Sequence, residues 1–90
     1  MVRWTIYVQS FENQDDIISI DIDSESTFLE LRKKAAFALN VNYNDLILAS
    51  KVEYDNKYDS EKLRDMESAD FRNESTLYAI HSVRGWTFRN

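Results

Sequence analysis

Histidine and cysteine, two side chains that often carry out catalysis, are nearly absent from this sequence, which has one histidine and no cysteine. The single histidine, His81, lies in an alternating apolar stretch, and no motif supplies it with a nucleophile or an orienting acid. We therefore predict a strand histidine packed at the sheet edge. Two acid pairs, Asp15/Asp16 and Asp21/Asp23, have residue types suited to acid–base work. Their positions in turns and on a polar strand face favour solvated charges, so we expect no catalytic residues and no enzyme activity.

Metal and cofactor chemistry also lacks the residues that it needs. The sequence has no cysteine, which excludes disulfides, thiol redox centres and zinc–thiolate sites. Its one histidine argues against a transition-metal site built from protein ligands. Gly85 is the only glycine, whereas glycine-rich phosphate loops need several glycines close together. We expect neither a bound metal ion nor a cofactor.

Size and charge narrow the classes of partner. The 90 residues suffice for one domain, and they carry 11 Lys and Arg against 16 Asp and Glu, a net charge of −5. This acidic balance argues against nucleic acids and anionic membranes, which bind clustered cations. The triplet Arg32–Lys34 is interpreted as a solvated helix face, with contact to an acidic partner as the alternative. No apolar run exceeds Ala35–Leu39, so no membrane-spanning segment is predicted, and we expect a monomer in the cytoplasm or the nucleus.

Two periodic patterns in the first half of the chain predict a hairpin followed by a helix. Residues 4–10 and 17–23 alternate with period two, as strands with one buried face do. Thr27 and Glu30 have the spacing of a capping box, and Asn40 is suited to end a helix in a left-handed conformation. Between them an apolar stripe recurs at helical spacing and predicts a helix over 28–39; it comprises Phe28, Leu31, Ala35, Ala38 and Leu39.

The second half is less regular. The short apolar run at residues 46–50 predicts a third strand. Residues 53–63 have little apolar content and predict a loop, with or without a short edge strand. Met66 and Phe71 are isolated apolar residues that indicate a single helical turn pinned to the core, and residues 75–83 predict the last strand. Near the N-terminus, Trp4 is expected to cover the bottom of the core. The alternative places Trp4 in an outward cluster with Tyr7 and Ile17.

Several of these segments resemble ubiquitin-like β-grasp domains. The similar segments are the first strand at Trp4–Val8, the acidic turn and threonine cap at Asp23–Phe28, the short-turn segment at Arg64–Met66 and Asp70–Phe71, the start of the last strand at Glu74–Leu77, and the start of the tail at Val83–Gly85. The resemblance implies an α+β β-grasp roll, in which a mixed sheet of four or five strands packs on one helix. It places a ubiquitin-like domain at residues 4–84 and a tail or the start of a linker at 85–90.

The resemblance also implies a binding surface. In this family the last strand lies between the first and the third, so their outward-facing residues gather on one face. Family members use that face as a shallow apolar patch for ubiquitin-binding domains and related partners. Carried over position by position, the patch comprises Phe11, Ala49, Tyr78 and Ile80, with Ile47 beside it. Ala49 is smaller than the family's central aliphatic residue, and Tyr78 replaces the family's histidine.

The implied function is protein binding without catalysis. We expect a module of a larger protein that links it to the ubiquitin–proteasome system or a related regulatory pathway. The alternative is a conjugable modifier processed after Gly85, although Trp86 stands where such modifiers usually have a second glycine. A third reading, nucleic-acid binding through Arg84 and Arg89 in the tail, fits the net charge least well.

Overall fold

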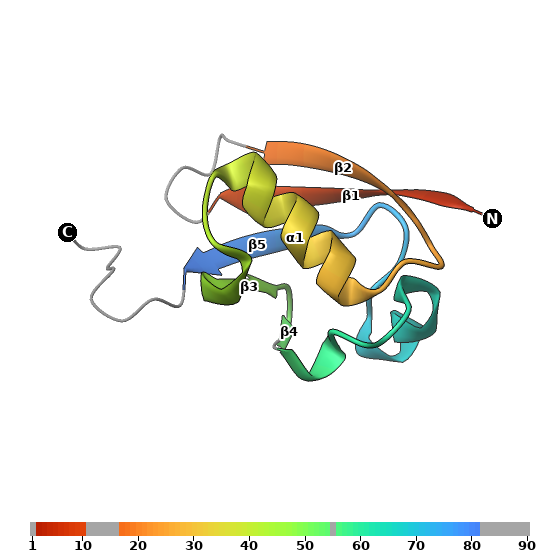
Figure 1. The fold of residues 1–90 in the computed structure, drawn as a ribbon. Coiled ribbons are helices and arrows are strands. Elements are labelled where there is room, and N and C mark those ends of the chain that lie inside the picture. The colour runs from red at the N-terminus through yellow and green to blue at the C-terminus, as the bar shows by residue number, and fades with distance from the viewer. Residues whose placement is uncertain (1, 11–16, 55, 82–90) are drawn as a thin grey trace.

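The computed structural model describes residues 2–10, 17–54 and 56–81. Within these ranges five strands form one sheet: β1 (Arg3–Ser10), β2 (Ile17–Asp23), β3 (Leu46–Ala49), β4 (Glu53–Tyr54) and β5 (Thr76–His81). Their order is β2-β1-β5-β3-β4; β1 and β5 run parallel, and the other neighbours run antiparallel. The helix α1 (Phe28–Leu39) lies across one face of this sheet (Figure 1). The prediction of an α+β fold with a mixed sheet and one helix is confirmed.

Alternation along the strands separates the two faces of the sheet. In β1 and β2, Ile6 pairs with Ile20 and Val8 with Ile18, and β3 contributes Leu48 to the same side. These side chains pack with α1 in the core, whereas the residues between them point to the opposite face. A slip of one residue in register would exchange the two sets, so the apolar pattern fixes the pairing.

The ends of α1 form as their sequence predicts. The Thr27 hydroxyl accepts a hydrogen bond from the Glu30 N–H, and the Glu30 carboxylate accepts one from the Thr27 N–H. This reciprocal pair satisfies two backbone donors that the first turn of a helix leaves unpaired. At the other end Asn40 adopts a left-handed conformation with φ of 61°. Asparagine here takes the place of the glycine that more often ends a helix.

The buried side of α1 differs from the predicted apolar stripe. Its buried residues are Phe28, Leu31, Arg32, Ala35 and Ala36. The prediction is therefore wrong at Ala38, which is exposed, and at Arg32, which was expected on the solvated side. The helix is turned toward Arg32 because the guanidinium finds acceptors inside: it donates through Nε and Nη2 to the Asp59 carboxylate and through Nη1 to the Tyr43 carbonyl.

The second half contains more short elements than its sequence suggests. The edge strand β4 forms at Glu53–Tyr54, and 3-10 helices occupy Tyr43–Asp45, Asn56–Tyr58 and Leu63–Ala69. The last of these is longer than the single predicted turn, and it contributes Leu63 and Met66 to the core. His81 ends β5 and pairs with Leu46. β5 lies between β1 and β3, but its described pairing with β1 ends at Ala79, so the packing of His81 at the sheet edge stays a prediction.

An aromatic cluster closes one end of the core. Phe71 lies 5.9 Å from both Phe28 and Tyr54, measured between ring centroids, and Phe28 lies 5.6 Å from Tyr54. The Trp4 ring packs on this cluster, 6.1 Å from Phe71. The expectation that Trp4 covers the core is confirmed, so Trp4 does not join Tyr7 and Ile17 on the opposite face.

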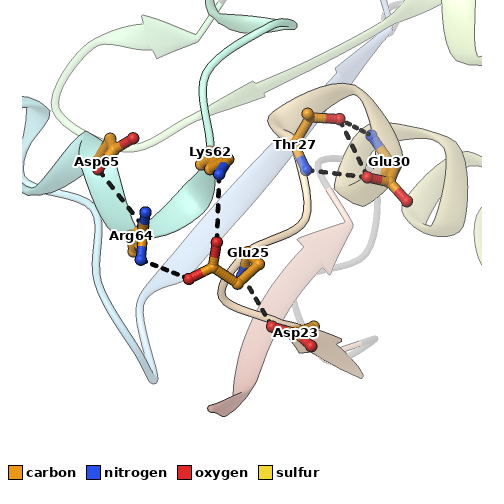
Figure 2. Close-up of polar contacts among 7 residues, drawn as sticks. All are labelled: Asp23, Glu25, Thr27, Glu30, Lys62, Arg64 and Asp65. Atoms are coloured by element: carbon orange, nitrogen blue, oxygen red, sulfur yellow. Dashed lines mark hydrogen bonds and ion pairs between the residues drawn. The ribbon is translucent and has the colours of Figure 1, made fainter. Parts of the chain in front are cut away.

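The loop between β2 and α1 is fastened to the segment that follows Ser60. The Leu63 N–H donates to the Ser26 carbonyl at 2.9 Å, and the Arg64 N–H to the Ser24 carbonyl at 3.0 Å. Figure 2 shows Lys62 and Arg64 converging on the Glu25 carboxylate, at 3.3 Å and 2.5 Å. These contacts hold the start of α1 against the 3-10 helix at Leu63–Ala69. Among the described residues, no helix has the length and apolar character needed to span a membrane.

Candidate functional site

The face of the sheet opposite α1 carries a continuous uncharged strip. The strand register sets Tyr78 beside both Gln9 and Ala49, Tyr7 beside Thr76 and Ser19, and Ile80 beside Ile47. We call this surface the uncharged strip; it runs from β2 to β3 and comprises Ile17, Ser19, Tyr7, Gln9, Thr76, Tyr78, Ile80, Ile47 and Ala49. None of these residues is an acid or a base, although 30% of the chain is charged.

The structure brings four of the five predicted patch residues together. Ile47 and Ile80 form one cross-strand pair, and Ala49 and Tyr78 form the next. Directly opposed side chains on one face lie within contact distance of each other. Phe11, the fifth residue, lies outside the described residues. The grouping therefore depends on β5 inserting between β1 and β3, as the resemblance implied.

The four residues differ in how much surface they offer. Tyr78 is 45% exposed, and Ile47 and Ile80 are half-buried. Ala49 is only 6% exposed, although it is not part of the core cluster. Its methyl group is the shortest apolar side chain of the strip, and longer neighbours shield it from solvent. A partner would therefore meet Tyr78 and the two isoleucines and would hardly touch Ala49.

Sequence reasoning missed the part of the strip on β1 and β2. Ile17 is 55% exposed and pairs with Gln9, which in turn pairs with Tyr78. Tyr7 and Ile17 were considered only as a separate cluster around Trp4. Period-two alternation already sets Tyr7 and Gln9 opposite Ile6 and Val8. Alternation within a strand does not show which strands pair, and the parallel pairing of β1 with β5 is what joins the two clusters.

Acidic residues border the uncharged strip on both sides. Asp21 follows Ser19 on the same face of β2 and pairs with Thr5, whose hydroxyl donates to the Asp21 carboxylate at 3.0 Å. On the edge strand β4, the exposed Glu53 pairs with Ala49. An apolar centre with a polar rim is the usual composition of a protein–protein interface.

The residues considered for catalysis have structural partners or lie outside the described part. Asp23 accepts a hydrogen bond from the Glu25 N–H at 2.8 Å, which shapes the turn before α1 (Figure 2). Asp15 and Asp16 lie outside the described residues, as do Arg84, Gly85, Trp86 and Arg89 in the tail. Within the described ranges, no group of three or more histidine, cysteine or acidic side chains is arranged to hold a metal ion.

The uncharged strip therefore contains four of the five residues of the predicted binding patch. Comparison with known proteins adds no family to this description: no protein-family model matches the chain, and neither does any curated protein.

Proposed function

We propose that the chain is a ubiquitin-like β-grasp domain that binds other proteins through the uncharged strip and has no catalytic role. The strand order β2-β1-β5-β3-β4, the parallel β1–β5 pair and the single helix on one face support the β-grasp assignment. The segments similar to ubiquitin fall on the matching elements: Thr27 caps α1, and Thr76–Leu77 begins β5.

The observation that carries this function is the absence of charge from a strip that includes the exposed Tyr78. Interface centres are depleted in charged residues and enriched in aromatic ones. A tyrosine offers a large ring with few rotatable bonds and a hydroxyl for hydrogen bonding, so it gains contact area at a low entropic cost.

The strip also favours a certain kind of partner. Because Ala49 is shielded, the contact centres on Tyr78 and Ile80, and the partner contributes an apolar surface that accommodates an aromatic ring. The bordering acids Asp21 and Glu53 favour basic residues around that surface. Ubiquitin-binding domains are the first candidates. They would link the chain to the ubiquitin–proteasome system, which operates in the cytoplasm and the nucleus.

The proposal is tested by NMR titration of the labelled chain with a panel of isolated ubiquitin-binding domains. We expect backbone shifts on β1, β3 and β5 with at least one domain. Ile80→Glu should abolish them, because an interface would have to bury the new carboxylate. Tyr78→Ala, at a more exposed position, should weaken binding about tenfold, as removal of one central interface side chain does.

Val2→Glu is the matched control, since Val2 is 57% exposed and precedes β1, at the end of that strand away from Gln9 and the strip. It should leave binding unchanged. All three variants should keep the unfolding midpoint close to that of the parent chain. If no domain shifts the strip, or if the control weakens binding as much as Tyr78→Ala, the uncharged strip is not the binding surface.

A further inference from the structure

The outer side of α1 carries the most exposed large apolar side chain of the described residues. Phe37 is 87% exposed, against 57% for Val2 and 55% for Ile17. Its neighbour Ala38 is exposed as well. A helix that packs on a sheet by one side normally turns polar residues to water on the other. An almost fully exposed phenylalanine in the last turn of α1 has no role in the core.

Two lysines lie one turn before Phe37 on the same side. Lys33 and Lys34 precede it by four and three residues, the spacings at which helix side chains are neighbours. Both are exposed, and neither is in an ion pair with any described residue. Glu30, the acid one turn earlier, is occupied by its bonds to Thr27. The Lys33 ammonium lies 5.0 Å from the centre of the Tyr43 ring, which steadies it beside the helix.

This pairing of unneutralised cations with an exposed ring is unusual for a chain with a net charge of −5. The third residue of the basic triplet sharpens the contrast, because Arg32 is buried and paired with Asp59. Lys33 and Lys34 are therefore the part of the triplet that is available for an incoming group. Their complement is a carboxylate, and the complement of Phe37 is an apolar side chain.

We propose that Lys33, Lys34, Phe37 and Ala38 form a second docking surface, which binds an acidic protein segment that carries an apolar anchor. The anchor covers the Phe37 ring, and flanking carboxylates pair with the two ammonium groups. This surface is on the side of α1 away from the sheet, whereas the uncharged strip is on the far face of the sheet (Figure 1). It does not depend on the function proposed for the strip.

Two other occupants fit the same residues less well. An anionic membrane is recognised by clusters of about four to eight cations, and this face offers two. A second copy packed about a two-fold axis would bring equivalent lysines close together around the shared Phe37 contact, at a cost in repulsion. An acidic protein segment satisfies the ring and the charges together.

The test is a selection of random linear peptides displayed on phage, with the full chain as bait, followed by fluorescence anisotropy with synthetic copies of the selected peptides. We expect the peptides to combine acidic residues with at least one large apolar residue. Phe37→Ser and Lys34→Glu should each weaken binding roughly tenfold. Added salt should weaken it further, because the ion pairs form at an exposed surface.

Matched variants separate this surface from the rest of the molecule. Val52→Ser removes another exposed apolar side chain, and Ile80→Glu alters the uncharged strip; neither should change the affinity. Phe37→Ser should leave the unfolding midpoint unchanged, because its ring is exposed. The proposal is wrong if no peptide distinguishes the parent chain from Phe37→Ser, or if the selected peptides lack acids. It is equally wrong if the parent chain forms a dimer, or adsorbs to phosphatidylserine vesicles, and Phe37→Ser abolishes that association. The occupant would then be a second copy of the chain or a membrane.

Discussion

A buried guanidinium fixes the position of the segment around Asp59 relative to α1. The Arg32 side chain is 7% exposed and that of Asp59 is 22% exposed, and Arg32 also donates to the Tyr43 carbonyl. One side chain thereby joins α1, the 3-10 helix at Tyr43–Asp45 and the turn that follows the 3-10 helix at Asn56–Tyr58. An ion pair of this kind contributes little net stability compared with an apolar pair of the same shape, but it is costly to break.

Asp59→Ala should therefore be strongly destabilising. It leaves Arg32 buried without its counter-charge, and breaking a buried pair costs about 3–5 kcal/mol. The partial exposure of Asp59 places our expectation near 3 kcal/mol, at the lower end of this range. Arg32→Met combined with Asp59→Ala should cost less than Asp59→Ala alone, because no unpaired charge remains. Urea denaturation of the single and double variants measures both values, and a double variant no more stable than Asp59→Ala would show that the unpaired guanidinium does not cause the loss.

Single residues differ in how far their roles follow from the sequence. The capping pair Thr27 and Glu30 and the left-handed Asn40 are local, so type and spacing were sufficient to predict them. Glu74 also adopts a positive φ, of 68°, and nothing in its residue type indicates this. Its N–H donates to the Thr5 carbonyl, a contact from a distant strand, and tertiary structure therefore determines its conformation.

At the scale of elements, apolar periodicity predicted where strands and helices form better than it predicted which side of α1 is buried. The strands β1, β2 and β3 and the helix α1 lie within about a residue of the predicted bounds, because their apolar spacing is regular. The rotation of α1 about its axis was wrong, since the helix pattern counts Arg32 as polar and cannot anticipate Asp59 as a buried partner. The 3-10 helices at Tyr43–Asp45 and Asn56–Tyr58 are three residues long, too short for a periodic signal. The longer one at Leu63–Ala69 has apolar residues at a spacing of three, which the helix and strand periods of 3.6 and two do not match.

Leucine substitutions at two alanines test that rotation directly. Ala36 is 2% exposed, so Ala36→Leu adds volume to a filled core and should cost about 1–3 kcal/mol. Ala38 is exposed, and Ala38→Leu should change the stability by less than about 0.5 kcal/mol. Thermal unfolding of the two variants compares the same chemical change on two sides of one helix. The opposite order would restore the originally predicted stripe, with Ala38 inside.

At the scale of the whole molecule, the two proposed surfaces differ in charge and lie on opposite sides of the fold. The uncharged strip is bordered by Asp21 and Glu53, whereas the outer side of α1 presents Lys33 and Lys34. Partners suited to one surface are therefore disfavoured at the other, and both surfaces are open at the same time. The two proposals together would let the domain bridge two proteins. Only the assembled topology reveals the arrangement of the two surfaces, because the strip depends on pairing between strands far apart in sequence.

The sequence of the tail predicts a binding domain rather than a conjugable modifier of the family that the chain resembles. Conjugable members expose a terminal glycine, usually one of a pair, because residues without side chains must thread the narrow channel of the activating enzyme. Here the corresponding residues are Arg84, Gly85 and Trp86, which lie outside the described residues, and in the sequence Trp86 stands where the second glycine is expected. We expect that the chain forms no thioester with ubiquitin-activating enzyme and ATP, and that cell extracts leave the Gly85–Trp86 bond intact. Mass spectrometry of the two reaction mixtures measures both outcomes. A species that ends at Gly85, or an adduct on a lysine of another protein, would favour the modifier, because cleavage there restores the terminal glycine on which conjugation depends.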